Sequence, residues 1–194
     1  TKPQPRFDTQ RAIYTRVQAV LDSAITRLGG TGNGPAFIDL VYGGDGQKWI
    51  RTARTLKARY FLHVSPVDNT ALASALTNAQ QGIASAADDW RTYHSSTEGE
   101  QNQWFQFRRQ RGTDIGGGKW LIDLLQLRSD PRLPNYFAPT SGTTFRGALP
   151  GEEDETVSWL SAARADPAYR QPMITWAENQ LILAEAQQRT GQDG

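Results

Sequence analysis

The side chains best suited to contact a ligand lie in one aromatic, amide-rich segment, residues 101–108, which reads QNQWFQFR. A sugar ring has apolar C–H faces and polar edges, so a flat aromatic ring can cover a face while Asn, Gln, Arg or Asp binds the hydroxyls. Covering half of an aromatic side chain of about 200 Å² contributes roughly 2–3 kcal/mol before the cost of association. The same rings could instead fold back to pack their own loop, and both interpretations stay open.

Paired carboxylates are the first candidates for general acid and base catalysis. They occur at Asp88-Asp89, at Glu98 with Glu100, and in residues 152–155. Adjacent carboxylates in polar loops are typically solvated charge, and no pattern here indicates that any pair is buried together.

Nucleophiles and metal ligands are also scarce. His63 lies at the apolar-rich end of a predicted helix and is interpreted as structural, whereas His94 follows two aromatic residues and could make a polar contact with a ligand. Neither has a second histidine at helical spacing of the zinc type, and no P-loop, nucleophile elbow or dinucleotide fingerprint is present. The sequence therefore predicts no catalytic residue, no metal site and no cofactor.

The composition further narrows the classes of function that the protein could have. The 194 residues carry 21 Lys and Arg against 20 Asp and Glu, a net charge of +1, so no overall field favours nucleic acid. The densest basic group, Arg108, Arg109 and Arg111, is too small to be a nucleic-acid footprint. Cysteine is absent, which excludes disulfides and thiolate sites, and no apolar run approaches the length of a membrane span.

Amphipathic periodicity indicates the elements that must position these side chains. Asp8 and Asp68 are predicted N-caps, Gly29-Gly30 a stop, and Pro172 a first-turn proline. The acidic cluster at 152–155 precedes a possible short helix at 156–165. The predicted helices cover residues 8–28, 47–64, 68–87, 119–127 and 172–190.

The segments between these helices, residues 88–118 and 128–171, are rich in glycine, proline and aromatic residues and are predicted to be ordered loops. The short connection after residue 64 predicts an antiparallel hairpin of two helices. The fold class expected is all-α, with helical hairpins joined by long loops, and residues 1–194 are treated as one partial α domain. The last helix is expected to pack through Met173, Trp176, Ala177, Gln180, Leu181, Ala184 and Gln188.

Five stretches together resemble the SusD/RagB family of outer-membrane nutrient-binding lipoproteins. Each is weak alone, but they follow one another in the order typical of that family. They are YTRVQAVLDSAITRL at 14–28, VYGGDGQKWIRTARTLKARY at 41–60, residues 103–111, DPRL at 130–133 followed by Tyr136-Phe137, and PMITWAENQLILAEAQQRTG at 172–191. Arg54 departs from the pattern, since the family often has Asn there.

The resemblance implies tetratricopeptide-like helix pairs that support a loop-rich ligand face. It implies a protein without catalytic activity that captures oligosaccharides, or sometimes peptides, for a SusC-like TonB-dependent transporter. It also implies a place on the extracellular face of the outer membrane, through a lipid anchor that lies outside this sequence. The chain is expected to be an internal piece of a longer protein.

If the chain has this function, the aromatic side chains of the loops are candidates to cover sugar faces, and neighbouring polar side chains are candidates to bind sugar hydroxyls. The predicted ligand-binding residues are Trp90, Tyr93, Asn102, Trp104, Arg108 and Tyr136. Two alternatives stay open: a tetratricopeptide-like scaffold that binds only protein, and a helical glycoside-active enzyme whose two carboxylates would converge about 5–10 Å apart.

Overall fold

The computed structural model describes residues 6–112, 114–152, 154 and 156–191. The chain forms two compact units. The helical unit consists of Thr1–Thr92 with Pro172–Gly194, and the loop-rich unit consists of Tyr93–Gln171.

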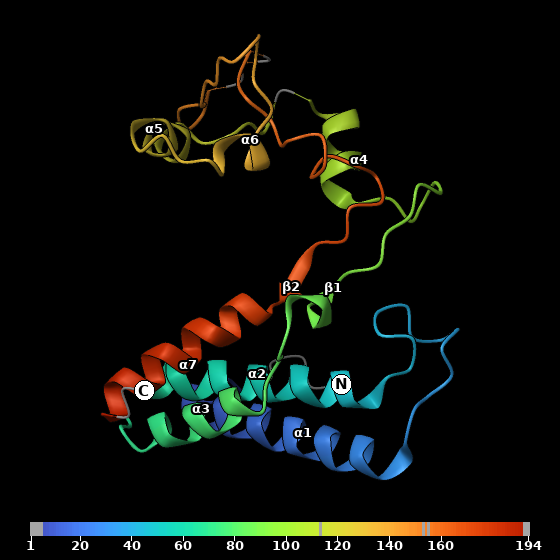
Figure 1. The fold of residues 1–194 in the computed structure, drawn as a ribbon, viewed down its shortest axis with the longest axis vertical. Coiled ribbons are helices and arrows are strands. Elements are labelled where there is room, and N and C mark those ends of the chain that lie inside the picture. The colour runs from blue at the N-terminus through green and yellow to red at the C-terminus, as the bar shows by residue number, and fades with distance from the viewer. Residues whose placement is uncertain (1–5, 113, 153, 155, 192–194) are drawn as a thin grey trace. The chain divides into compact units, whose positions relative to one another are not determined.

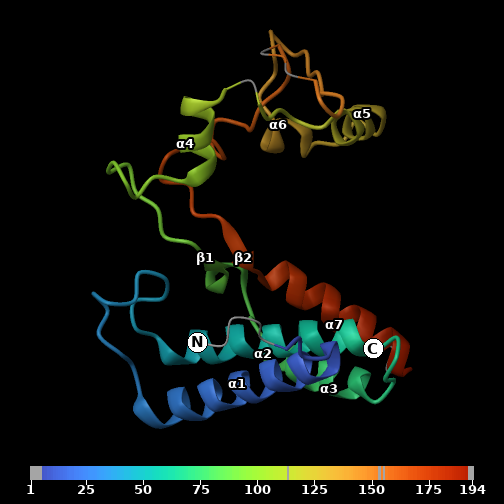
Figure 2. The same cartoon turned by 180° about the vertical axis from the view of Figure 1, so that it is seen from behind.

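Four helices lie side by side in the helical unit (Figures 1 and 2): α1 (Gln10–Thr31), α2 (Gly46–Val64), α3 (Ala71–Gln80) and α7 (Trp176–Thr190). Each packs against the next, α1 on α2, α2 on α3 and α3 on α7. Small residues let the backbones approach closely, because Ala58 and Ala79 pack with Ile182, and Ala75 with Ala186. The helical hairpin predicted from the short connection is therefore present as α2 and α3.

Capping explains where these helices begin. Asp45 accepts hydrogen bonds from the backbone N–H groups of Gln47 and Lys48 and starts α2. The predicted caps Asp8 and Asp68 are wrong. Thr9 caps α1, while the Asp68 carboxylate accepts from the backbone and hydroxyl of Thr70, a turn that delays α3 to Ala71.

Three predicted helix boundaries also differ. The predicted stop at Gly29-Gly30 is wrong, because α1 continues through both glycines to Thr31 and the residue with positive φ that ends it is Gly32. The helix expected over 68–87 ends at Gln80, and a short 3-10 turn, η1 (Ala86–Asp88), follows separately. The helix expected from Pro172 starts at Trp176 with Thr175 as its cap. Pro172 instead belongs to β2 (Pro172–Ile174), which pairs antiparallel with β1 (Trp90–Arg91).

The face on which α7 packs was also predicted wrongly. Leu181, on the predicted stripe, is 72% exposed, whereas Ile182 beside it is 5% exposed. The buried face is Asn179, Ile182 and Ala186, because Asn179 makes buried hydrogen bonds to the turn after α3.

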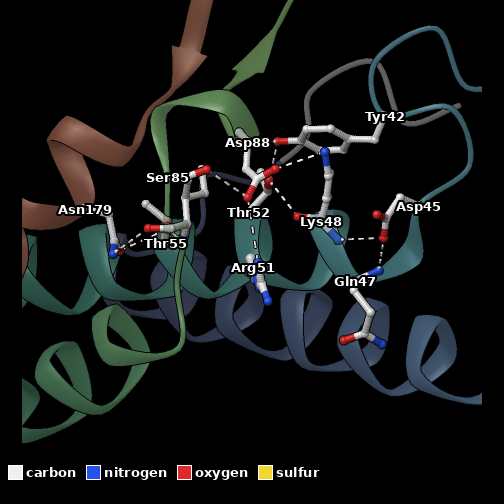
Figure 3. A network of polar contacts seen from close by, with 11 residues as sticks. Tyr42, Asp45, Gln47, Lys48, Arg51, Thr52, Thr55, Ser85, Asp88 and Asn179 are labelled. Atoms are coloured by element: carbon white, nitrogen blue, oxygen red, sulfur yellow. Dashed lines mark hydrogen bonds and ion pairs between the residues drawn. The ribbon is translucent and has the colours of Figure 1, made fainter.

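The glycine-rich loop before α2 is held by a polar network (Figure 3). The Tyr42 hydroxyl lies 2.7 Å from that of Thr52 and donates to the Asp88 carbonyl at 2.9 Å. The Asp88 carboxylate pairs with Lys48 at 2.9 Å, and this contact helps to lower the pKa of Asp88. This network therefore holds the loop in place, and residues 32–45 contain no strand.

The loop-rich unit contains α4 (Gln103–Gln110), α5 (Lys119–Leu127) and α6 (Leu133–Tyr136) (Figure 1). Its core is Ile122, Leu125, Leu133 and Phe137. The bounds of α5 match the prediction, but α4 lies inside the predicted loop 88–118 and α6 inside 128–171. The possible helix at 156–165 is absent, because this segment pairs with the end of α6: Ala138 N–H donates to the Trp159 carbonyl at 2.8 Å.

Across the described residues, none of the helices combines the length and apolar character that crossing a bilayer requires.

Candidate functional site

A pocket of about 260 Å³ lies within the loop-rich unit. Four aromatic side chains line it together with Ile115, Leu160 and two glycines, and an arginine and a glutamine add polar groups. Such a mixture of flat apolar rings and a few polar groups is typical of small-molecule sites. The lining residues most relevant to binding are Trp104, Phe137, Trp159, Arg164, Tyr169 and Gln171.

Asn102 positions the accessible ring of this pocket. Its side chain is 2% exposed, accepts from the Trp104 backbone N–H at 2.9 Å and so caps α4. The same amide donates to the Tyr169 carbonyl at 3.0 Å, and the Asn102 N–H donates to the Pro167 carbonyl at 2.7 Å. One buried amide therefore joins the segments that carry Trp104 and Tyr169, while Trp104 remains 45% exposed.

Trp159 forms a more deeply buried wall. It is 7% exposed, and the guanidinium carbon of Arg108 lies 5.2 Å from its ring centre, a cation–π contact. Burial lowers the pKa of Arg108. The Trp159 indole nitrogen is buried and has no hydrogen-bond partner among the described residues.

Gly117 lines the same pocket where the chain passes close to the core. A β-carbon there would lie 2.7 Å from Ile122 Cδ1 and 2.8 Å from Phe137 Cε1. Glycine is therefore required for the backbone to approach this closely. The neighbouring cation, Arg164, lies with its guanidinium carbon 4.7 Å from the ring centre of Tyr136.

Several carboxylates in the described part of the chain are engaged by local cations. Arg146 pairs with Glu152 and with Asp154, each at 2.5 Å, and Asp88 pairs with Lys48. Among the residues described, no group of three His, Asp or Glu side chains could hold a metal ion.

A family model named SusD-like_2, described as "Starch-binding associating with outer membrane", matches residues 1–191. The chain belongs to the SusD-like family. The resemblance inferred from the five sequence stretches is thereby confirmed, and so is the all-α fold class with its long loops. The family associates with the outer membrane.

Solved structures agree with this assignment. A chitin-binding protein is 25% identical with a TM-score of 0.81, covering 98% of this SusD-like chain and 46% of that chain. A SusD-like protein from Bacteroides thetaiotaomicron is 23% identical with a TM-score of 0.84, and the match covers 100% of this chain and 43% of that protein. A SusD homologue from Bacteroides uniformis is 23% identical with a TM-score of 0.80, and the match covers 94% of this chain and 40% of that protein.

The SusD-like chain thus spans less than half the length of these solved structures. Among curated proteins, none matches it.

The structure brings together only part of the predicted site. Trp104 lines the pocket, and Asn102 holds Trp104 in position. Arg108 and Tyr136 do not line the pocket themselves: Arg108 contacts Trp159 and Tyr136 contacts Arg164, which do. A binding role for each stays a prediction.

Two predicted platforms lie elsewhere. Trp90 belongs to the helical unit and packs on Trp49, with ring centres 6.0 Å apart. Tyr93 belongs to the loop-rich unit but is not among the lining residues, and its ring lies 6.0 Å from the Arg170 guanidinium carbon.

Sequence reasoning missed Trp159, Tyr169, Arg164 and Gln171. These residues come from a segment that was interpreted as irregular or weakly helical. Their aromatic and polar types matched the chemistry sought, but no local spacing connects them to Trp104, and long-range bonds such as Asn102 to Tyr169 do so instead.

Proposed function

We propose that this SusD-like protein captures an oligosaccharide, without chemical conversion, at the pocket of the loop-rich unit. The observation that carries the proposal is the half-exposed Trp104 ring beside buried Trp159, with Arg164 and Gln171 in the same lining. At about 260 Å³ the pocket is slightly smaller than the roughly 300 Å³ at which drug-sized sites begin, which fits one sugar ring of a chain.

The comparisons support the ligand class. The family description names starch, and one solved relative at 25% identity is a chitin-binding protein. Both ligands are polysaccharides, so α-glucan and N-acetylglucosamine oligosaccharides are the first ones to test. A peptide ligand remains a narrower possibility implied by the family resemblance.

The wider setting that we propose follows the family. The complete protein sits on the extracellular face of the outer membrane through a lipid anchor outside this sequence, and passes its ligand to a SusC-like TonB-dependent transporter. We also propose that residues 1–194 are one part of a single SusD-like domain, because solved relatives cover 94–100% of the chain and so include both compact units.

Calorimetric titration of the protein with maltohexaose and with chitohexaose tests the proposal. Trp104→Ala removes the accessible ring and should weaken binding about 30- to 150-fold, corresponding to roughly 2–3 kcal/mol for half a ring. Trp120→Ala is the matched control, because Trp120 is 83% exposed in the same unit and does not line the pocket. Equal binding by wild type and Trp104→Ala would contradict the proposal.

A protein-interaction scaffold is the second candidate. The exposed apolar side chains on α5, namely Trp120, Leu121, Leu124 and Leu127, favour it, because exposed apolar patches mark interaction surfaces. No oligosaccharide binding together with a tight protein complex would support the scaffold. Hydrolysis of a chromogenic glycoside would contradict both candidates.

A further inference from the structure

A second concave site lies entirely within the helical unit. It is a groove of about 670 Å³ formed by the first half of α1, the end of α2 and the start of α3. Its volume lies within the roughly 300–1,000 Å³ of ligand sites and is more than twice that of the pocket in the loop-rich unit.

Three aromatic side chains form a fixed cluster in this groove. The ring centres of Tyr14 and Tyr60 are 5.8 Å apart and their planes meet at 74°. His63 lies edge-on to both, with its ring centre 6.5 Å from that of Tyr14 and 5.9 Å from that of Tyr60. Edge-to-face contacts at these distances are favourable, so the rings hold one another in place while remaining open to solvent in part.

Uncharged polar groups line the groove beside these rings. Gln10, Thr15, Gln18, Thr70 and Ser74 supply amides and hydroxyls. The Gln18 side-chain nitrogen donates to the Lys57 carbonyl at 3.2 Å, but its buried oxygen Oε1 has no hydrogen-bond partner among the described residues. An unsatisfied buried acceptor is costly, so a turn of the Gln18 side chain towards the groove would let this oxygen accept from a ligand hydroxyl.

The charged side chains that line the groove balance one another. Arg11 and Asp68 are both in the lining, and Asp68 already accepts from the hydroxyl of Thr70 at 2.5 Å. This balance disfavours a strongly acidic or basic partner. Helical walls also leave no free strand edge on which a peptide backbone could pair.

We infer that this groove is a second oligosaccharide-binding site, in which the tyrosine rings cover the C–H face of a sugar and the amides and hydroxyls bind its edges. The site goes beyond the proposed function, because it lies in the other compact unit and shares no residue with the pocket around Trp104. Its volume of about 670 Å³ suits a short run of sugar units, and the neutral lining selects uncharged glycans.

Histidine NMR provides a readout specific to the groove. The chain has two histidines: His63 lines the groove, and His94 lies in the loop-rich unit. Titrating the protein with maltohexaose or chitohexaose should shift the imidazole signals of His63 and leave those of His94 in place. None of the described lining residues is Trp, so this binding should leave tryptophan fluorescence unchanged.

Two variants and one control test the assignment. Tyr14→Ala should weaken the response at His63 at least tenfold, whereas Ile13→Ala should leave it within about twofold, because Ile13 is exposed on the same helix outside the groove. Ser74→Tyr adds bulk to the groove without removing packing and should also abolish the response. No shift at His63 with either probe, or a shift retained in both groove variants, would overturn the inference.

The two binding-site assignments can be tested independently of each other. If Trp104→Ala removes the tryptophan fluorescence response but leaves the His63 response, both assignments stand. If Trp104→Ala changes nothing while Tyr14→Ala removes all binding, the groove is the glycan site and the proposed pocket is wrong. If a peptide library shifts His63 and neither glycan does, the groove is a peptide site and the inference is overturned.

Discussion

The Thr55 hydroxyl on α2 donates to Asn179 Oδ1 on α7 at 3.0 Å, across 124 positions of sequence (Figure 3). Thr55 also accepts from the Ile83 N–H at 3.0 Å, and the Asn179 amide nitrogen donates to the carbonyls of Ala79 and Ile83. Two buried side chains therefore connect α2, the turn after α3, and α7. This link fixes which face of α7 is buried.

Asn179→Ala should destabilise the protein by about 2–4 kcal/mol, because it removes the buried acceptor of the Thr55 hydroxyl and one donor each to the carbonyls of Ala79 and Ile83. Urea unfolding followed by circular dichroism measures the change. Gln188→Ala, at an exposed position of the same helix, should stay within about 0.5 kcal/mol of wild type. Equal stability of the two variants would show that the link contributes nothing.

Two glycine substitutions should have opposite effects. A β-carbon at Gly82 would lie 2.3 Å from Asn179 Oδ1 and 2.5 Å from Thr55 Oγ1, so Gly82→Ala should destabilise the protein by roughly 1–3 kcal/mol. At Gly29, inside α1, a β-carbon has no neighbour within 4 Å, and Gly29→Ala should stabilise the helix by about 0.5–1 kcal/mol. Thermal unfolding of both variants checks the signs, and a stabilising Gly82→Ala would refute the close contact.

Asp39 should be required for the loop before α2. Its carboxylate accepts from the N–H groups of Val41, Tyr42 and Gly44 and, at 2.7 Å, from the Trp49 indole. Burial alone would raise the pKa of Asp39, but these bonds lower it overall. Asn offers one acceptor oxygen in place of two, so Asp39→Asn should cost about 1–3 kcal/mol.

Hydrogen exchange is the measurement for Asp39→Asn. Amides at 41–44 and the Trp49 indole N–H should exchange faster in the variant, while those of α7 should keep their wild-type rates. Asp45→Asn is the matched control, since Asn caps helices about as well as Asp. Unchanged protection at Gly44 would contradict the assigned role.

Sequence patterns predicted the elements whose ends are set locally. The starts and ends of α2 and α5 were predicted to within one residue, because Asp45 caps α2 and proline residues follow both helices closely. In contrast, α4 buries none of its residues and was interpreted as loop. Its position depends on Asn102, whose partners Pro167 and Tyr169 are far away in sequence.

The buried face of α7 and half of the pocket lining could not be predicted from the sequence, for a similar reason. Apolar spacing favours Leu181 over Asn179 as a buried residue, and only the distant Thr55 and Ile83 reverse that preference. Trp159 is placed by backbone pairing with 136–138 rather than by any helical period. Side-chain type was therefore informative for Trp104, whereas tertiary hydrogen bonds determined its neighbours.

Acid should weaken the turn between α5 and α6. The Arg132 guanidinium and backbone N–H hold the Asp130 carboxylate and lower its pKa to about 2, from an ordinary value of 3.8. A carboxyl whose pKa is lower in the folded state stabilises the fold at neutral pH. That contribution should decline as the pH falls below about 4 and be lost below about 2.

The melting temperatures of wild type and Asp130→Asn should therefore differ at pH 7 and converge as the pH falls below about 2, because both side chains are then uncharged. Asp123→Asn, on exposed α5, corrects for the loss of one negative charge. Arg132→Ala should move the Asp130 titration, followed by carboxyl NMR, back towards its ordinary value. A difference that grows on acidification, or an Asp130 titration unaffected by Arg132→Ala, would show that this pair does not stabilise the turn.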